Sequence, residues 1–204
     1  DVVPCMELYG HMHNLFRFEK YADLGLPRYG GEFDPRNPRM YEVLDNWIEQ
    51  TAKLFPSPWY HVGFDEPWSL GKIGVVPGKD PFKTFMDVLR HISEKARSHG
   101  KRIGFFADID QGASTISKHP ELLQDVPAGA IAYPWIYEVR TNYAPFVEPL
   151  AQRGDSEAQY RLGRMYEFGR GVLVNMPQAM IWLRKSAAQE NASGVGRQSS
   201  EASG

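Results

Sequence analysis

The residues best suited to chemistry are two adjacent acids, Asp65 and Glu66, at the end of the segment His61-Val62-Gly63-Phe64-Asp65-Glu66. Adjacent strand residues point to opposite faces, so both carboxyl groups can serve one pocket only where the strand gives way to loop. Pro67 follows directly and helps to impose that break. A carboxyl pair there suits general acid catalysis beside a charged partner. An isolated acidic pair more often only solvates a loop, so its context has to decide.

Aromatic residues are frequent in this stretch and in the neighbouring predicted strands. Aromatic rings provide apolar walls on which sugars stack, and a carboxyl packed against them has a raised pKa that suits a general acid. The alternative is that the rings fill a core. The residues are Tyr60, Phe64, Trp68, Phe105, Phe106, Tyr133 and Trp135.

The elements that must position the acids alternate between short β-like runs and amphipathic helical patterns, which predicts parallel strands joined by helices. Strands are expected at 2–6, 58–63, 102–107 and 130–135, and helices at 37–54, 80–100, 117–123 and 143–151. The predicted fold class is therefore α/β. In parallel α/β barrels the carboxyl ends of the strands form the active face, and Asp65, Glu66, Asp108, Tyr137 and Glu138 all fall at such ends.

The composition excludes several classes of partner. The 23 basic and 25 acidic residues are spread evenly and leave a net charge of −2, so neither nucleic acid nor an anionic membrane is an expected partner. No apolar run approaches the roughly 20 residues of a membrane helix. The single cysteine, Cys5, rules out an internal disulfide and leaves the compartment open.

After residue 153 the sequence changes character. Two amphipathic helices are expected at 156–168 and 175–188, separated by Gly169-Arg170-Gly171, as in an αα-hairpin. The segment 190–204 has one large aliphatic residue, Val195, and is predicted to be a disordered tail.

The motif His61-x-Gly63-x-Asp65-Glu66 at a strand end resembles the catalytic signature of the family 20 glycoside hydrolases, the β-N-acetylhexosaminidases. The match extends to Val3-Pro4 followed by Gly10-His11, and to Phe106-Ala107-Asp108 and Trp135, which resemble the neighbouring strands of that family. The resemblance implies a TIM (β/α)8-type barrel and a glycan substrate that carries N-acetylhexosamine, and it requires no cofactor and no metal.

The resemblance also implies a role for each matched residue. Glu66 is the acid that protonates the glycosidic oxygen, and Asp65 orients the 2-acetamido group of the substrate, which acts as the nucleophile. Such substrate-assisted hydrolysis retains the anomeric configuration. The residues expected to bind substrate are His11, His61, Trp68, Asp108, Trp135 and Tyr137.

The chain departs from the family pattern in ways that leave its sugar preference open. Phe64 replaces a glycine that is common in the signature, and Cys5 and Glu7 stand where many members carry Glu and Asp. The resemblance covers about four strand–helix units, residues 1–152, whereas a full barrel needs roughly 250 residues. We therefore expect a partial barrel without its first two and last two units, and weak or no activity from this chain alone.

Residues 153–189 resemble a Sel-one-like repeat, a tetratricopeptide-type helix pair. The matching residues include Gly154, Ala158, Tyr160, Leu162, Gly163, Tyr166, Gly169, Gly171, Ala179, Trp182 and Ala187. Arrays of such repeats bind protein partners, and about three are normally needed for a stable stack. A protein partner is therefore expected here.

Two other functions compete with glycan hydrolysis. His11 and His13, with His61 and Asp108, could ligate a metal as in other barrel hydrolases. The second alternative treats the partial barrel as an inactive relic and the repeat as a protein-interaction module.

Overall fold

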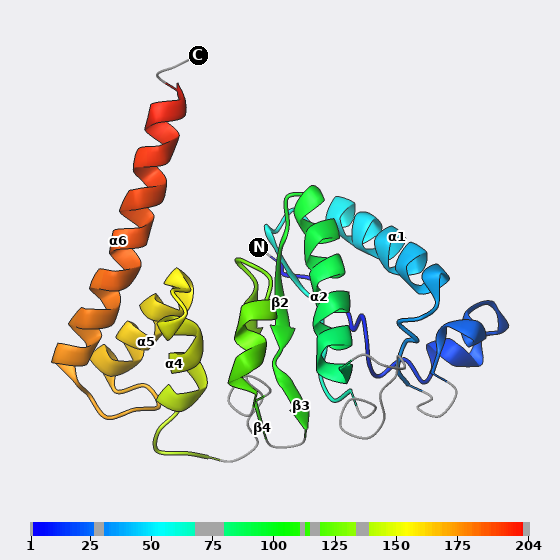
Figure 1. Ribbon diagram of the computed structural model, residues 1–204, viewed down its shortest axis with the longest axis horizontal. Helices are drawn as coiled ribbons and strands as arrows, with labels where there is room; N and C mark the ends of the chain where they lie inside the picture. The colour runs from blue at the N-terminus through cyan, green and yellow to red at the C-terminus, as the bar shows by residue number, and fades with distance from the viewer. Residues whose placement is uncertain are drawn as a thin grey trace. The chain divides into compact units, whose positions relative to one another are not determined.

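The computed structural model describes residues 2–26, 31–67, 80–110, 113–114, 119–133 and 139–201. For some of these, among them 108–110, 113–114 and 190–201, only the backbone is described. The chain divides into two compact units, Asp1–Tyr137 and Glu138–Gly204 (Figure 1). Each unit is described by itself below.

The first unit is built on a parallel sheet of three strands in the order β1-β2-β5. These are β1 (Trp59–His61), β2 (Arg102–Phe106) and β5 (Ile131–Tyr133), which lie within the segments predicted as strands. The N-terminal segment 4–8 lies parallel to β1 and is joined to it by an isolated bridge between Cys5 and His61. The expected strand at 2–6 is therefore an extended segment rather than a regular strand.

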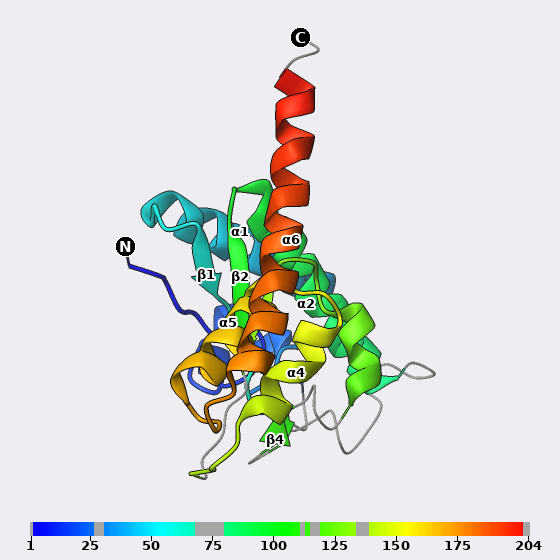
Figure 2. The ribbon, with the colours of Figure 1, turned by 90° about the vertical axis from the view of Figure 1, so that its left-hand side faces the viewer.

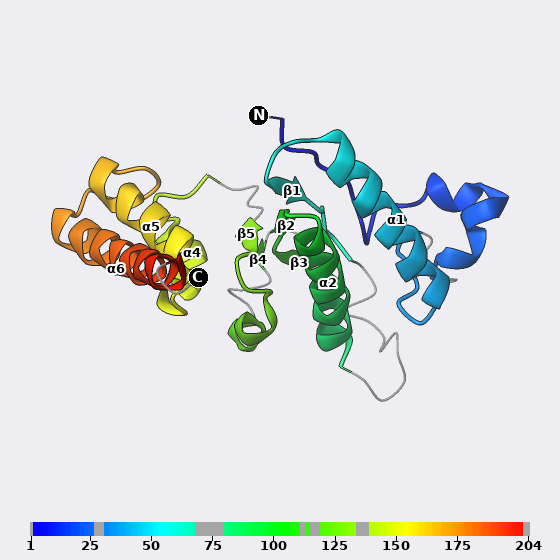
Figure 3. The same cartoon turned by 90° about the horizontal axis from the view of Figure 1, so that it is seen from above.

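Two helices of the first unit follow the predicted capping signals. Helix α1 (Pro38–Leu54) begins after Asn37 and helix α2 (Pro81–Ser98) after Asp80, and each cap side chain accepts a hydrogen bond from its first turn. Proline at the first helical position suits both starts because its missing N–H has no partner there. Figure 3 shows α1 and α2 side by side along the sheet, and the two helices contact each other.

Side chains alternate between the two faces of this sheet. Ile103 and Phe105 of β2 are buried on the face that α2 covers, whereas Gly104 lies against His61 and Tyr133 on the other face. The acids that follow β1 therefore emerge at the end of a sheet whose one face is sealed by helices.

The connections contain structure that the sequence did not predict. The long loop before α1 includes two 3-10 helices, η1 (Leu15–Arg17) and η2 (Glu19–Leu24). Strands β3 (Asp108–Asp110) and β4 (Ala113–Ser114) form a small antiparallel pair. The helix expected at 117–123 is instead a 3-10 helix, η3, at Pro120–Asp125; it begins at a proline, which suits a first helical position.

The second unit contains three helices, α4 (Ala144–Gln152), α5 (Ser156–Phe168) and α6 (Met176–Glu201). Helix α5 packs against both α4 and α6 (Figure 2). The Gln159 side chain donates to the carbonyl of Ala151 at 2.9 Å, so α4 is tied to the repeat helices although we expected it to end the first domain. The domain boundary at residue 152 stays a prediction.

Helix α6 continues through most of the segment 190–204, for which we predicted disorder. Helical hydrogen bonds are local, so a helix can continue without a partner surface. That this segment is disordered in solution stays a prediction. Among the helices of the described residues, none is long and apolar enough to cross a membrane.

Gly163 sets the distance between α5 and α6. A Cβ atom at this position would lie 2.7 Å from Leu183 Cγ and 3.2 Å from the Ala179 carbonyl oxygen. We expect Gly163→Val to lower the free energy of unfolding of this unit by about 1–3 kcal/mol, since the helices must separate. Urea denaturation followed by circular dichroism measures the loss.

The matched control is Arg161→Val, which places the same side chain at an exposed position of the same helix and removes one ion pair with Glu157. Its expected cost is about 0.5 kcal/mol. Equal costs for the two substitutions would show that α5 and α6 do not approach closely at Gly163.

Candidate active site

The acid pair lies directly beyond the carboxyl end of β1, as predicted. Three residues of this loop have left-handed backbone, Gly63 (φ 71°), Phe64 (φ 75°) and Glu66 (φ 46°). Non-glycine residues rarely adopt such angles, and they persist where surrounding contacts over-determine them, often at functional sites. The loop thus turns sharply around Asp65, which is buried with 8% of its surface exposed.

His11 is brought to the acids by the turn that follows segment 4–8. Its Nε2 lies 3.1 Å from Asp65 Oδ2 and 3.9 Å from Glu66 Oε2. Its own backbone is left-handed, with φ 54°. Three of the predicted site residues therefore form one cluster, in which the imidazole faces both carboxyl groups.

A third carboxyl group, that of Glu7, lies next to Asp65 of this cluster. Glu7 Oε1 accepts the backbone N–H groups of Tyr9 and Gly10 at 3.2 Å and of Phe64 at 2.9 Å. Its carboxyl group also hydrogen-bonds to that of Asp65. Burial, and then this bond, raise the pKa of Glu7 from 4.5 to about 8, although the N–H donors act in the opposite direction.

His61 braces the strand end. The N–H of Gly63 donates to His61 Nδ1 at 3.3 Å, and Cys5 Sγ lies 3.4 Å from the same nitrogen. The ring contacts Phe106 and Tyr133. Burial lowers the pKa of His61 and raises that of the Cys5 thiol. His61 is therefore a neutral, half-buried group that holds the start of the acid-bearing loop.

The prediction that the aromatic rings form sugar-stacking walls is wrong for three of them. Tyr60, Phe64 and Phe105 are at most 1% exposed. The ring of Phe64 packs against Tyr9 and Phe85 at centroid distances of 5.3 and 4.9 Å. These rings are core, because their positions along the strand or loop direct them inward; this arrangement also anchors the acid-bearing loop.

Several predicted substrate-binding residues are not positioned by the structure. Trp68, Trp135 and Tyr137 lie outside the described residues, and Asp108 begins β3 without a described side chain. Their roles stay predictions. Within the described part of the chain, no three His, Cys, Asp or Glu side chains are placed to hold a metal ion.

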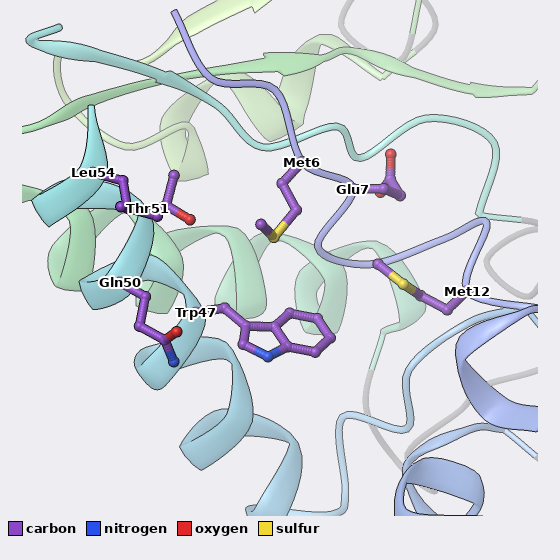
Figure 4. Close-up of a pocket in the computed structure, with 7 residues that line it drawn as sticks. All are labelled: Met6, Glu7, Met12, Trp47, Gln50, Thr51 and Leu54. Atoms are coloured by element: carbon purple, nitrogen blue, oxygen red, sulfur yellow. The ribbon is translucent and has the colours of Figure 1, made fainter. Parts of the chain in front are cut away.

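A pocket of about 530 Å³ lies between segment 4–8 and α1. It is mostly apolar, and its lining residues are Met6, Glu7, Met12, Trp47, Gln50, Thr51 and Leu54. Figure 4 shows Met6 pointing toward Trp47, whereas the Glu7 carboxyl group turns away from the indole. Glu7 therefore contributes to the rim of this pocket, while its carboxyl group bonds to Asp65 of the acid cluster.

Comparison with known proteins separates the two units. Residues 156–191 match the Sel1 repeat family. A β-hexosaminidase of Emericella nidulans is 27% identical over 156 residues, which are 71% of this chain and 24% of that protein. Hexosaminidase D of Bos taurus is 30% identical over 74 residues, 35% of this chain and 21% of that protein.

A solved structure agrees with these relatives on the fold. The GH20 exo-β-N-acetylglucosaminidase of Vibrio harveyi, in complex with N-acetylglucosamine, superposes with a TM-score of 0.51 at 19% identity, over 80% of this chain and 24% of that chain. The chain thus spans about a quarter of the length of these hexosaminidases. The findings agree with a partial GH20-like segment followed by a Sel1 repeat.

Gly63 tests the contact between the acid-bearing loop and Glu7. A Cβ atom at Gly63 would collide with the Glu7 carboxyl group, whereas one at Gly100 would meet nothing within 4 Å. The two glycines have nearly equal φ angles, 71° and 74°. Alanine at either position should cost about 1–2 kcal/mol for the left-handed backbone. Gly63→Ala should cost at least about 1 kcal/mol more, because the collision adds to it.

Urea denaturation of both variants measures the difference in the free energy of unfolding. If Gly63→Ala and Gly100→Ala lower it equally, Glu7 does not press against the loop.

Proposed function

We propose that this chain, which is similar to part of the GH20 hexosaminidases and carries a Sel1 repeat, contributes the catalytic acids for hydrolysis of terminal β-linked N-acetylhexosamine. The observation that carries the proposal is the cluster of His11, Asp65 and Glu66 at the carboxyl end of a parallel strand. Helices cover one face of the sheet, and the left-handed backbone of the loop after β1 turns the acids away from the direction of that strand.

The first unit is interpreted as four consecutive strand–helix units of a (β/α)8 barrel, in which segment 4–8 is the first strand. The parallel order of segment 4–8, β1, β2 and β5 supports this interpretation. Because the chain spans about a quarter of its hexosaminidase relatives, the rest of the sugar-binding wall is proposed to come from further barrel units.

The mechanism assigns different work to the two acids. Glu66 gives its proton to the glycosidic oxygen while the carbonyl oxygen of the 2-acetamido group attacks the anomeric carbon from within the substrate. Asp65 accepts the acetamide N–H, which orients the amide and stabilises its developing positive charge. Glu66, now a carboxylate, then takes a proton from the water that opens the cyclic intermediate, and the configuration is retained.

The surroundings of the acids support this division. Asp65 is 8% exposed and lies against His11 and Glu7, so its orientation is held before substrate arrives. The Glu66 side chain is 15% exposed and reaches the cluster edge, where a leaving group can approach. His61, Trp68, Asp108, Trp135 and Tyr137 are proposed to contact the sugar, with His61 acting mainly as a brace.

The acid role of Glu66 predicts a dependence on the leaving group. We expect Glu66→Gln to lower kcat/KM about 10²–10⁴-fold for an N-acetyl-β-glucosaminide with a poor, alkoxide-type leaving group. The loss should be much smaller for a nitrophenyl leaving group, which departs without a proton. Steady-state kinetics on both substrates measures the two losses.

The control is Glu49→Gln on the exposed surface of α1, which should leave both rates unchanged. Equal losses on the two substrates, in a variant that stays folded by circular dichroism, would contradict general acid catalysis by Glu66.

A second function, protein binding through the Sel1 repeat, is supported by exposed apolar side chains in the second unit. Leu173 and Val174 are 88% and 62% exposed, and Met176, Met180 and Ile181 are about half exposed. Their concentration within residues 173–181 of a helical repeat favours an interaction surface.

Replacing Leu173 and Val174 by Ser tests this second function. We expect the folded double variant to lose a protein partner that wild type enriches in quantitative affinity capture from its source cells. Arg161→Ser serves as the exposed control. Identical partner profiles for all three proteins would contradict binding through Leu173 and Val174.

A further inference from the structure

Glu7 occupies an unusual position for an acidic side chain. One of its oxygens accepts three backbone N–H groups from two different loops. Its other oxygen, Oε2, is the nearest atom to the position of a Cβ on Gly63. The carboxyl group is thus enclosed between the Tyr9-Gly10 turn, which leads into His11, and the loop that carries Asp65.

We infer that Glu7 is a positioning residue of the proposed active site, which in its protonated form donates a hydrogen bond to Asp65 and clamps the His11 turn to the acid-bearing loop. The catalytic part of this inference rests on the proposed function. The structural part, a proton held between Glu7 and Asp65, does not.

The geometry supports the direction of this bond. Glu7 Oε1 is occupied by the N–H donors of Tyr9, Gly10 and Phe64, so Oε2 is the oxygen left to carry a proton toward Asp65. Two buried carboxylates in contact cannot both ionise without strong repulsion, and one proton shared between them removes it. Asp65 is then left with lone pairs for His11 and for a substrate amide.

The charges around Glu7 agree with a retained proton. Within the described residues, the titratable groups that interact with Glu7 are Asp65 and Cys5. Asp65 in turn interacts with His11 and His61, and His11 lies near Glu66. The Cys5 thiol has a raised pKa and stays neutral over the range of interest. Burial raises the pKa of Glu7 to about 8, which places its ionisation within an accessible pH window.

The pH dependence of stability tests the proton without any assay of activity. A raised pKa means that folding is favoured most below pH 4.5, where Glu7 is protonated in both states, and that this advantage is lost as pH rises through about 8. Glu7→Gln keeps the shape and the donor but cannot ionise. The unfolding constant of wild type, relative to Glu7→Gln, should therefore rise by up to about tenfold per pH unit between pH 4.5 and about 8.

Urea denaturation at pH 5, 7 and 8.5 measures this ratio. The control is Glu49→Gln. Lys53 lowers the pKa of Glu49, so Glu49 stays ionised at all three pH values and its replacement should give a flat ratio. A flat ratio for Glu7→Gln over the same range would overturn the inference.

The positioning role is tested by the pH profile of hydrolysis of an N-acetyl-β-glucosaminide. At pH 6, Glu7→Gln should keep kcat/KM within about threefold of wild type, and the alkaline limb of its profile should move to higher pH. Glu7→Ala, which leaves three N–H groups without their acceptor, should lose most of its activity. A merely structural Glu7 would leave the alkaline limb in place.

The outcomes separate this inference from the proposed function. If wild type shows no hydrolysis, the proposed function fails for this chain and the stability ratio alone decides whether Glu7 holds the proton. If hydrolysis occurs and the alkaline limb of Glu7→Gln does not move, the positioning role is overturned.

Discussion

The site depends on one constraint: carboxyl groups from two segments of the chain must lie together in a poorly hydrated place. Glu7 comes from segment 4–8 and Asp65 from the loop after β1, and the parallel pairing of these segments brings the two into contact. Shared protonation and three backbone N–H donors reduce the repulsion. The same contacts hold the left-handed backbone of the residues around Asp65. They therefore offset the backbone strain of the loop as well as the repulsion between the carboxyl groups.

The core supports this arrangement from below. The ring of Phe64, one residue before Asp65, is fully buried between Tyr9 and Phe85, so the loop is anchored both by its backbone bonds to Glu7 and by apolar packing. A glycine at this position would give up that anchor. Phe64, which we regarded as a departure from the family signature, is thus explained by the core of this chain.

Local signals in the sequence predicted the helices well. Asn37 and Asp80 cap α1 and α2 as expected, and α5 spans its predicted residues, because caps, prolines and glycines act within a few residues of their position. The acid pair was singled out from its residue types and its place at a strand end, and His11 from the family resemblance; the structure brings the three together. The face on which each strand residue lies depends on tertiary packing, and this is why Tyr60 and Phe105 were assigned to a sugar site and are core.

Glu7 was missed as a member of the site because its role depends on contacts with Phe64 and Asp65, nearly sixty residues away. The available signal was an acid two residues after Cys5, on the same side of an extended segment that precedes a Gly-His turn. The 3-10 helices and the β3–β4 pair were missed for a similar reason, since they arise in connections without periodic hydrophobicity.

The central claim is that Asp65 and Glu66 act on a substrate that supplies its own nucleophile. The most direct measurement compares turnover of an N-acetyl-β-glucosaminide with that of the otherwise identical β-glucoside, and follows the configuration of the first-formed sugar by proton NMR. We expect that any hydrolysis, however weak in this partial barrel, is of the acetamido sugar alone, with the β configuration retained. Equal turnover of the two sugars, or an α product, would contradict it.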